Sequence, residues 1–334
     1  MEMLATTGSL APMGAKPVLC VGGLVVDFPL AQGALRAVDG VSYEVMAGET
    51  LALVGESGSG KSASVLAAVG LLPAARTAGS VVIDGLDFLH LDPRTRRRQL
   101  GRLVAVIFQD PAAALNPVMT VGAQLTEALA VHNPRLGAAA LRTRAIELLR
   151  QVEVPEPALR FRQYPHQFSG GMAQRAMIAI AIANRPRLLI ADEPTTALDV
   201  TIQAQLLHLL RQAQIETGAA TLLITHDLGV VAELADRVAV MYAGRIVELG
   251  TVHDVFARPA HPYTVALLRS LPRVDSDDDL QPIPGTPPDM RRRPPGCAFE
   301  PRCFLGRGRT RCQTEPPPLA GAPHRSACHF RNEL

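Results

Sequence analysis

The sequence has 334 residues, of which 48% are hydrophobic and 19% charged, and its formal net charge is +2. This composition is typical of a globular chain with a substantial core and allows one large domain or two smaller ones. The near-neutral charge argues against bulk electrostatic binding to nucleic acid, and no apolar run approaches the ~18 residues that a membrane span needs. Residues 1–17 lack a basic start and a sustained apolar centre, so we expect a flexible N-terminus, no signal peptide and a cytoplasmic chain.

In chain order, alternating apolar residues from about 18 to 45 predict antiparallel strands, with a turn at 47–49. A short buried strand is expected over 51–54, and a helix over 63–72. Later strands are expected at 80–83, 103–108, 188–191, 221–225 and 238–242. Helical patterns separate these later strands, which favours an α/β core with a mainly parallel sheet. From 109 to about 163 there is no strand candidate, and helical spacing over 121–131 and 138–152 predicts a helical insertion.

Between the strand expected over 51–54 and the helix expected over 63–72, the chain matches the phosphate-binding pattern G-x-x-x-x-G-K-[ST]. The matching residues are Gly55, Glu56, Ser57, Gly58, Ser59, Gly60, Lys61 and Ser62. Glycines let successive backbone N–H groups curl around phosphate oxygens at the start of a helix, which already favours anions. Lys61 would reach the β- and γ-phosphates, and the Ser62 hydroxyl would ligate Mg²⁺. The pattern therefore predicts binding of a nucleoside triphosphate.

Two carboxylates, Asp192 and Glu193, end the apolar strand expected at 188–191. The carboxyl end of a strand beside a phosphate-binding loop is where an α/β sheet binds its ligands. Asp192 would hold Mg²⁺ through water, and Glu193 would polarise the water that attacks the γ-phosphate.

A second potential anion site opens the helix that we expect to run to about residue 183. It consists of Ser169, Gly170 and Gly171, and small residues at a helix N-terminus can bind a phosphate. Since one nucleotide does not need two such sites in one chain, we expect this segment to face the nucleotide of another subunit.

Taken in order, these motifs resemble those of the nucleotide-binding subunits of ATP-binding cassette (ABC) transporters, over about residues 18–250. The ordered set comprises the phosphate-binding loop, Gln109, Ser169-Gly170-Gly171, Asp192-Glu193, Ala197-Leu198-Asp199 and Thr225-His226-Asp227. The resemblance implies a P-loop NTPase (RecA-like) core with an antiparallel β subdomain and an inserted helical subdomain at about 110–183. It also implies ATP and Mg²⁺ as cofactors, bound between two such subunits arranged head to tail.

The resemblance implies a role for each matching residue. Phe28 is similar to the aromatic residue that stacks on adenine, with Tyr43 as a rival, and Gln109 to the glutamine that senses Mg²⁺ and the attacking water. Ser169 and its glycines would grip the γ-phosphate of the partner, and Asp199 would cross the dimer interface. His226 would hydrogen-bond the γ-phosphate and steady the water.

Beyond residue 271 the composition changes, because this end holds 12 of the 27 prolines and four of the five cysteines. The run from His261 to Leu268 and this Pro/Cys-rich end resemble the ATPases of oligopeptide and dipeptide importers. So do residues 108–111 and 115–117. The resemblance implies two transmembrane permease subunits as partners, a binding protein outside the membrane, and a place at the cytoplasmic face of the membrane. His261 itself is interpreted as structural.

The four cysteines of this end suggest a metal site. Cys297, Cys303, Cys312 and Cys328 have five, eight and fifteen residues between neighbours, and thiols of a cytosolic protein more often bind metal than form disulfides. The spacing leaves zinc and an iron–sulfur cluster open, whereas the importer resemblance favours a [4Fe–4S] cluster. Cys20 is expected to be a core thiol, and Arg291–Arg293 a solvated or partner-facing patch.

The sequence therefore predicts an ATPase that powers peptide import. We expect a flexible N-terminus at 1–17, an ATPase domain at 18–255 and a C-terminal tail at 256–334 with the four-cysteine site. The alternatives are an importer of another small solute such as a nickel chelate or glutathione, an exporter, and a soluble cassette ATPase that acts on DNA or ribosomes. The single cassette disfavours the soluble machine, and the tail disfavours the exporter.

Overall fold

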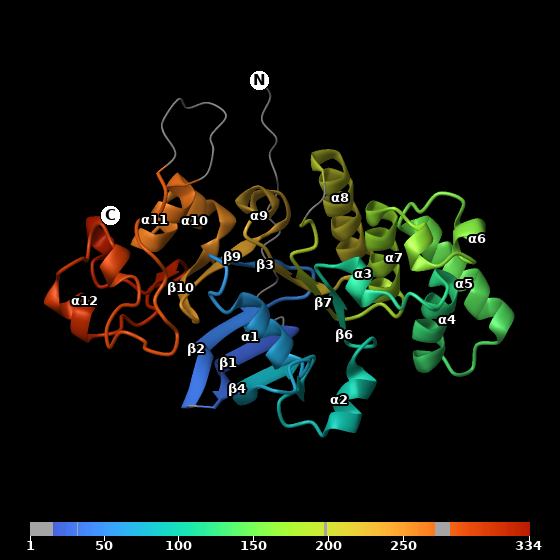
Figure 1. Cartoon of the computed structure of the whole chain (residues 1–334), viewed down its shortest axis with the longest axis horizontal. Coiled ribbons are helices and arrows are strands. Elements are labelled where there is room, and N and C mark those ends of the chain that lie inside the picture. The colour runs from blue at the N-terminus through green and yellow to red at the C-terminus, as the bar shows by residue number, and fades with distance from the viewer. Residues whose placement is uncertain (1–15, 32, 197–198, 271–280) are drawn as a thin grey trace.

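A computed structural model describes residues 16–31, 33–196, 199–270 and 281–334. Its centre is a seven-stranded sheet in the order β11-β10-β9-β3-β8-β7-β6 (Figure 1). Neighbours from β9 to β6 pair in parallel, whereas β10 and β11 are antiparallel. The strand bounds are β3 Thr50–Val54, β6 Val104–Ile107, β7 Leu188–Asp192, β8 Ala220–Ile224, β9 Arg237–Tyr242, β10 Arg245–Thr251 and β11 Arg325–Ser326. The parallel arrangement brings the carboxyl ends of β3, β6, β7 and β8 to one edge of the sheet.

The strands of this sheet are apolar on both faces, because both faces are covered. In β3, Leu51 and Leu53 pack on one side with the four-stranded sheet and α1 (Lys61–Ala68). Ala52 and Val54 pack on the other side with α9 (Leu228–Leu234) and the C-terminal tail. This two-sided burial explains why the strands read as continuous apolar runs in the sequence.

The second sheet is antiparallel in the order β2-β1-β4-β5. Its strands are β1 Leu19–Leu30, β2 Gly33–Val45, β4 Arg76–Ile83 and β5 Leu86–Asp87. Along β1, Leu19 and Val21 are buried in the core, whereas Cys20 between them is exposed. The expectation of a core thiol at Cys20 was therefore wrong, because successive side chains of a strand point to opposite faces.

Helices fill the chain between β6 and β7, and Figure 1 shows α4–α6 at the end of the molecule opposite the tail. They are α3 Pro111–Ala114, α4 Val121–His132, α5 Ala138–Gln151, α6 Pro157–Arg160 and α7 Gly170–Ile182, with a 3₁₀ turn, η1, at Pro165–Gln167. The remaining helices of the cassette are α2 Pro93–Gln99 and α8 Val200–Thr217. The helices expected at 121–131 and 138–152 are thus present as α4 and α5. Helix α1 ends four residues earlier than expected, where Gly70 (φ +74°) and Pro73 follow.

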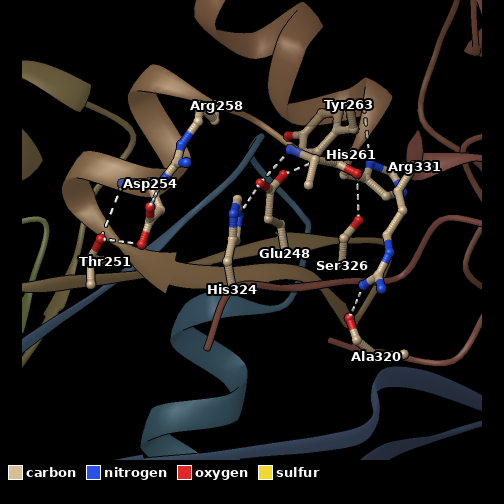
Figure 2. Close-up of polar contacts among 11 residues, drawn as sticks. Glu248, Thr251, Asp254, Arg258, His261, Tyr263, Ala320, His324, Ser326 and Arg331 are labelled. Atoms are coloured by element: carbon tan, nitrogen blue, oxygen red, sulfur yellow. Dashed lines mark hydrogen bonds and ion pairs between the residues drawn. The ribbon is translucent and has the colours of Figure 1, made fainter. Parts of the chain in front are cut away.

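The tail continues from α10 (Val252–Ala257) and α11 (Pro262–Arg269) into short elements, η2 Glu300–Arg302, α12 Thr310–Thr314, β11 and η3 Arg331–Glu333. Figure 2 shows how it attaches to β10 through Glu248, a carboxylate with 0% exposure. Glu248 accepts hydrogen bonds from the backbone N–H groups of Ala260 (2.7 Å) and His261 (3.0 Å), and His324 Nε2 lies 2.7 Å from its Oε1. Because a buried carboxylate without partners is costly, these contacts fix the tail against the sheet.

Arg293 also departs from expectation. Its guanidinium is 2.8 Å from Asp39 and donates to the carbonyl of Arg36, so it belongs to an intramolecular ion pair and not to a solvated patch.

Within the described residues, no helix is both long enough and apolar enough to cross a lipid bilayer.

Candidate active site

The phosphate-binding pattern forms the connection from β3 to α1. Gly60, with φ +99°, is the N-cap of α1, and a Cβ on it would lie 2.5 Å from the Ala37 carbonyl oxygen. A Cβ on Gly55 (φ +149°) would overlap the carbonyl oxygen of Met241 in β9. These two positions therefore need glycine for both backbone conformation and space. Ser59 is buried beside Gly55, so the loop packs closely against the neighbouring strands.

Lys61 is buried, with 6% exposure, and its ammonium group folds back over the loop. Lys61 Nζ donates to the carbonyl oxygens of Gly55 (2.8 Å) and Glu56 (3.1 Å). Burial lowers the pKa of Lys61, and the nearby carboxylates of Glu193, Asp192 and Glu56 oppose that shift. A phosphate bound at the loop would form an ion pair with this ammonium group.

Asp192 and Ser62 meet at the start of α1. The Ser62 hydroxyl donates to Asp192 Oδ1 at 2.8 Å, across 130 residues of sequence. Burial raises the pKa of Asp192 above its ordinary value, and the Ser62 hydrogen bond opposes this shift. A hydroxyl and a carboxylate side by side are hard oxygen ligands that fit Mg²⁺.

Glu193 follows β7 in a left-handed backbone conformation, φ +46°, which is uncommon outside glycine and recurs at active sites. Three side chains from separate segments reach its carboxylate. Gln109 Nε2 donates to Oε2 at 3.1 Å, the Thr196 hydroxyl donates to Oε2 at 3.2 Å, and His226 Nδ1 lies 3.3 Å from Oε1. The structure therefore brings together the three residues expected to act in catalysis, Glu193, Gln109 and His226, at the carboxyl edge of the sheet.

The Ser169 segment lies elsewhere. Ser169 is the N-cap of α7 and accepts from Met172 N–H at 3.3 Å, and both Ser169 and Gly170 are exposed. Gly171 packs toward Ile202 of α8, whose own N-cap is the exposed Asp199. Among the described residues, no hydrogen bond joins the segment 169–171 to the phosphate-binding loop. Ala197 and Leu198 lie outside the described residues.

The two aromatic candidates for adenine stacking differ in exposure. Tyr43 is 4% exposed in the core under the four-stranded sheet, so its ring has no face free for a base. Phe28 is half-buried at the end of β1 and packs only partly against that core, which leaves Phe28 as the candidate.

In the tail, Cys297, Cys303, Cys312 and Cys328 line one cavity together with Phe299 and Phe330, and all four are free thiols. Burial, together with the electrostatic effect of the other three thiol groups, raises the pKa of Cys297 to about 12. Yet no group of three or more His, Cys, Asp or Glu side chains in the described part of the chain is arranged to hold a single metal ion. The thiols thus share one cavity without converging on a point.

The sequence interpretation missed several residues around the site. Gln174, 2% exposed in α7, donates to the Pro194 carbonyl oxygen at 2.7 Å and so links α7 to the segment after Glu193. Tyr263 and Arg302 of the tail contact Glu56 of the loop. Tyr263 lies in the run from His261 to Leu268, and Gln174 follows the Ser169 segment. The sequence motifs assign these residues and Arg302 no role at the site, and only the contacts of the folded chain identify it. His261 is structural as expected: it caps α11 through Nδ1, and burial lowers its pKa to about 3.

Comparison with known proteins agrees with this geometry. A family model described as "ABC transporter" matches residues 38–196, and one described as "Oligopeptide/dipeptide transporter, C-terminal region" matches residues 247–312. The oligopeptide transport ATP-binding protein OppD of Mycobacterium tuberculosis is 52% identical over 324 residues, covering 96% of this chain and 52% of the relative. The dipeptide transport ATP-binding protein DppD of Bacillus subtilis is 51% identical over 292 residues, which cover 86% of this chain and 87% of the relative. Among solved structures, the dimeric ATP-binding cassette MJ0796, bound to ADP and Pi after hydrolysis, has a TM-score of 0.63 and 27% identity over 70% of this chain and 98% of that one.

The fold and the site define an ATP-binding cassette. The chain belongs to the family of ABC ATPases in its oligopeptide and dipeptide transporter branch. It spans about half the length of the mycobacterial relatives that it matches.

Proposed function

We propose that this chain is an ATP hydrolase that energises the import of dipeptides or oligopeptides through a membrane transporter. One observation carries the proposal: Glu193, with Gln109 and His226 on its carboxylate, stands at the sheet edge beside a phosphate-binding loop. A carboxylate in this position can polarise a water for in-line attack on a γ-phosphate. Peptides are the proposed cargo because the relatives with matching C-terminal regions are oligopeptide and dipeptide transport proteins.

In this proposal, residues Gly55 to Ser62 bind the phosphates of ATP and Phe28 stacks on the adenine. Lys61 leaves its carbonyl partners for the β- and γ-phosphates. Ser62, Asp192 and Gln109 hold Mg²⁺, which supplies charge neutralisation at the phosphates when bound. His226 holds the γ-phosphate and the attacking water in line with Glu193.

Ser169, Gly170, Gly171 and Asp199 act on the nucleotide of a second cassette, identical or homologous. The exposure of Ser169, Gly170 and Asp199 supports this arrangement, as does the lack, within the described chain, of a hydrogen bond from the segment 169–171 to its own loop. Binding of two ATP molecules would close the pair head to tail, and hydrolysis would release it. Two permease subunits and an extracytoplasmic binding protein complete the proposed transporter, with this chain peripheral at the cytoplasmic face of the membrane.

We further propose the division into an ATPase domain at 18–255, with a helical subdomain at about 110–183, and a tail at 256–334. Residues 1–15 of the N-terminal segment expected at 1–17 lie outside the described residues. In the tail, the four cysteines are proposed to bind a [4Fe–4S] cluster, with zinc as the alternative. A cluster several atoms across needs thiolates farther apart than one tetrahedral ion does, and four thiols around one cavity fit that demand better. Iron and acid-labile sulfide in anaerobically purified protein support the cluster, whereas zinc alone refutes it.

The variant Lys61→Ala tests the nucleotide site directly. We expect its affinity for Mg-ATP to fall by at least about a hundredfold, because the charge-assisted contacts to two phosphates are lost. A binding titration of the purified chain measures this loss. Unchanged affinity would refute the assignment of the loop. Reconstitution with its permeases and a candidate peptide then tests the cargo.

A further inference from the structure

We propose that Arg302 of the tail is a positioning residue for the nucleotide site, which it acts on by clamping Glu56 of the phosphate-binding loop. The inference rests on the proposed ATP binding by that loop. It assigns the tail a role in nucleotide affinity within the same chain, besides any role that the tail has in cofactor binding.

The clamp is a two-pronged ion pair. Arg302 Nη1 lies 2.8 Å from Glu56 Oε2, and Nη2 lies 3.0 Å from Oε1. The Arg302 side chain is 6% exposed and that of Glu56 24%, so water and salt screen the pair less than a surface pair. Paired parallel hydrogen bonds of this kind fix orientation as well as distance.

The guanidinium is itself held in place. Its Nε donates to the Pro284 carbonyl oxygen at 2.8 Å, and Nη1 also donates to the Tyr242 hydroxyl at 3.2 Å. The guanidinium carbon of Arg302 lies 5.8 Å from the ring centre of Tyr242 and 5.9 Å from that of Phe299, within the range of cation–π attraction. Arg302 therefore reaches the loop from a fixed position.

The backbone of Glu56 has a second hold from the same part of the chain. The Glu56 N–H donates to the hydroxyl of Tyr263 at 2.9 Å, and Tyr263 is fully buried in α11. The rings of Tyr242, Tyr263 and Phe299 pack on one another with centre distances of 4.6–5.4 Å. Side chain and backbone of Glu56 are thus both held by residues beyond 240, far from the loop in sequence.

This hold bears on Lys61, the residue that would contact the phosphates. Glu56 belongs to the phosphate-binding loop, and its carbonyl oxygen lies 3.1 Å from Lys61 Nζ, so a shift of Glu56 would also shift the loop backbone from which Lys61 reaches the phosphates. Without Arg302, the Glu56 carboxylate would also face an incoming phosphate unpaired, which is unfavourable. Both effects predict weaker ATP binding when the clamp is removed.

The test is a titration of Mg-ATP on the full chain, with Glu193→Gln present throughout to prevent turnover. We expect Arg302→Gln to weaken binding by about tenfold, and Arg302→Lys by less, since lysine keeps the charge but not the fork. In a Glu56→Gln background, Arg302→Gln should change affinity less than about twofold, because its partner is already neutral. Arg309→Gln is the matched control: Arg309 makes a two-pronged pair with Glu333 in the same tail, away from the loop, and its loss should leave affinity unchanged.

The outcomes separate the two proposals. If the parent chain binds no ATP, the proposed function fails. If it binds ATP and folded Arg302→Gln binds within twofold of it, the clamp is overturned, whatever its melting temperature. If Arg302→Gln does not fold, Arg302→Lys, which keeps the charge but not the paired hydrogen bonds to Glu56, should weaken binding about threefold; equal affinity in folded Arg302→Lys would then overturn the clamp.

Discussion

The starts of α1 and α7 are built from similar residues but stand in opposite surroundings. Both begin with glycine and serine, residues that suit an anion site at a helix N-terminus. At α1, Ser59 and Lys61 are buried, and Ser62 is bonded to Asp192. At α7, Ser169 and Gly170 are exposed, and the only hydrogen bond that the described chain gives the Ser169 side chain is the one from Met172 of its own helix.

In the proposed dimer, this difference separates the half of the site that one chain assembles from the half that a second chain would supply. The α1 half has its phosphate loop, its lysine and its carboxylates assembled by four neighbouring parallel strands. In the α7 half, Ser169 and Gly170 are exposed to solvent. Helix α7 nonetheless contacts the α1 half, since Gln174 of α7 donates to the Pro194 carbonyl oxygen beside Glu193. Variants that affect one half and spare the other can break or sharpen this comparison.

The largest effect is expected at Glu193, in the α1 half. Glu193→Gln should lower ATP turnover by roughly 10²–10⁴-fold, because the general base is lost while its hydrogen-bonding shape remains. ATP binding should persist, since the loop, Lys61 and Ser62 are untouched. Steady-state hydrolysis and a binding titration measure the two properties separately. Glu233→Gln, an exposed carboxylate on α9, serves as the control, and near-normal turnover in Glu193→Gln would remove it from the catalytic role.

The α1 half could be predicted from sequence because its signals are local. Residues 55–62 carry the phosphate loop in eight consecutive positions, and Asp192 and Glu193 directly follow an apolar run. The strands were predictable for the same reason, since burial on both faces makes each an uninterrupted apolar segment. Once β3, β6, β7 and β8 are parallel neighbours, their ends must meet, and so Gln109 and His226 reach Glu193.

The rest depends on contacts that no local pattern encodes. Arg302 and Tyr263 lie more than 200 residues from Glu56, and Arg302 is one of many arginines in the tail. Cys20 was wrongly predicted to be buried. In a strand with alternating burial, the position of a residue along the strand, and not its hydrophobicity, decides which face its side chain joins. Tyr43 was a rival to Phe28 in sequence, and only the packing of the four-stranded sheet buries it.

A second expectation concerns the α7 half, through Gly170→Asp. A Cβ at Gly170 meets no atom within 4 Å, and an acidic residue suits the first turn of a helix, so the variant should fold normally. Facing the γ-phosphate of a partner, the added carboxylate should lower turnover on the order of a hundredfold, because like charges across an interface cost several kcal/mol.

ATP affinity of the single chain should stay unchanged in Gly170→Asp, since its own loop lies elsewhere. Gly137→Asp at the start of α5 is the matched control, because Gly137 is also an exposed glycine at a helix start with no atom within 4 Å of its Cβ position. ATPase assays at increasing protein concentration compare the two. Equal turnover in both variants would contradict the trans role of α7.

The smallest effect separates the capping role of Ser169 from its proposed contact with a partner. Ser169 accepts from Met172 N–H at 3.3 Å, and Thr120 caps α4 in the same way, accepting from Ala123 N–H at 3.2 Å. Loss of either cap in Ser169→Ala or Thr120→Ala should lower the free energy of unfolding by about 0.5–2 kcal/mol. Only Ser169→Ala should also reduce turnover, by about tenfold, since a hydrogen bond to a charged phosphate oxygen is lost with the hydroxyl. Urea unfolding and ATPase rates on the same preparations decide the matter: if both variants lose equal stability and equal activity, Ser169 is a helix cap and α7 takes no part in hydrolysis.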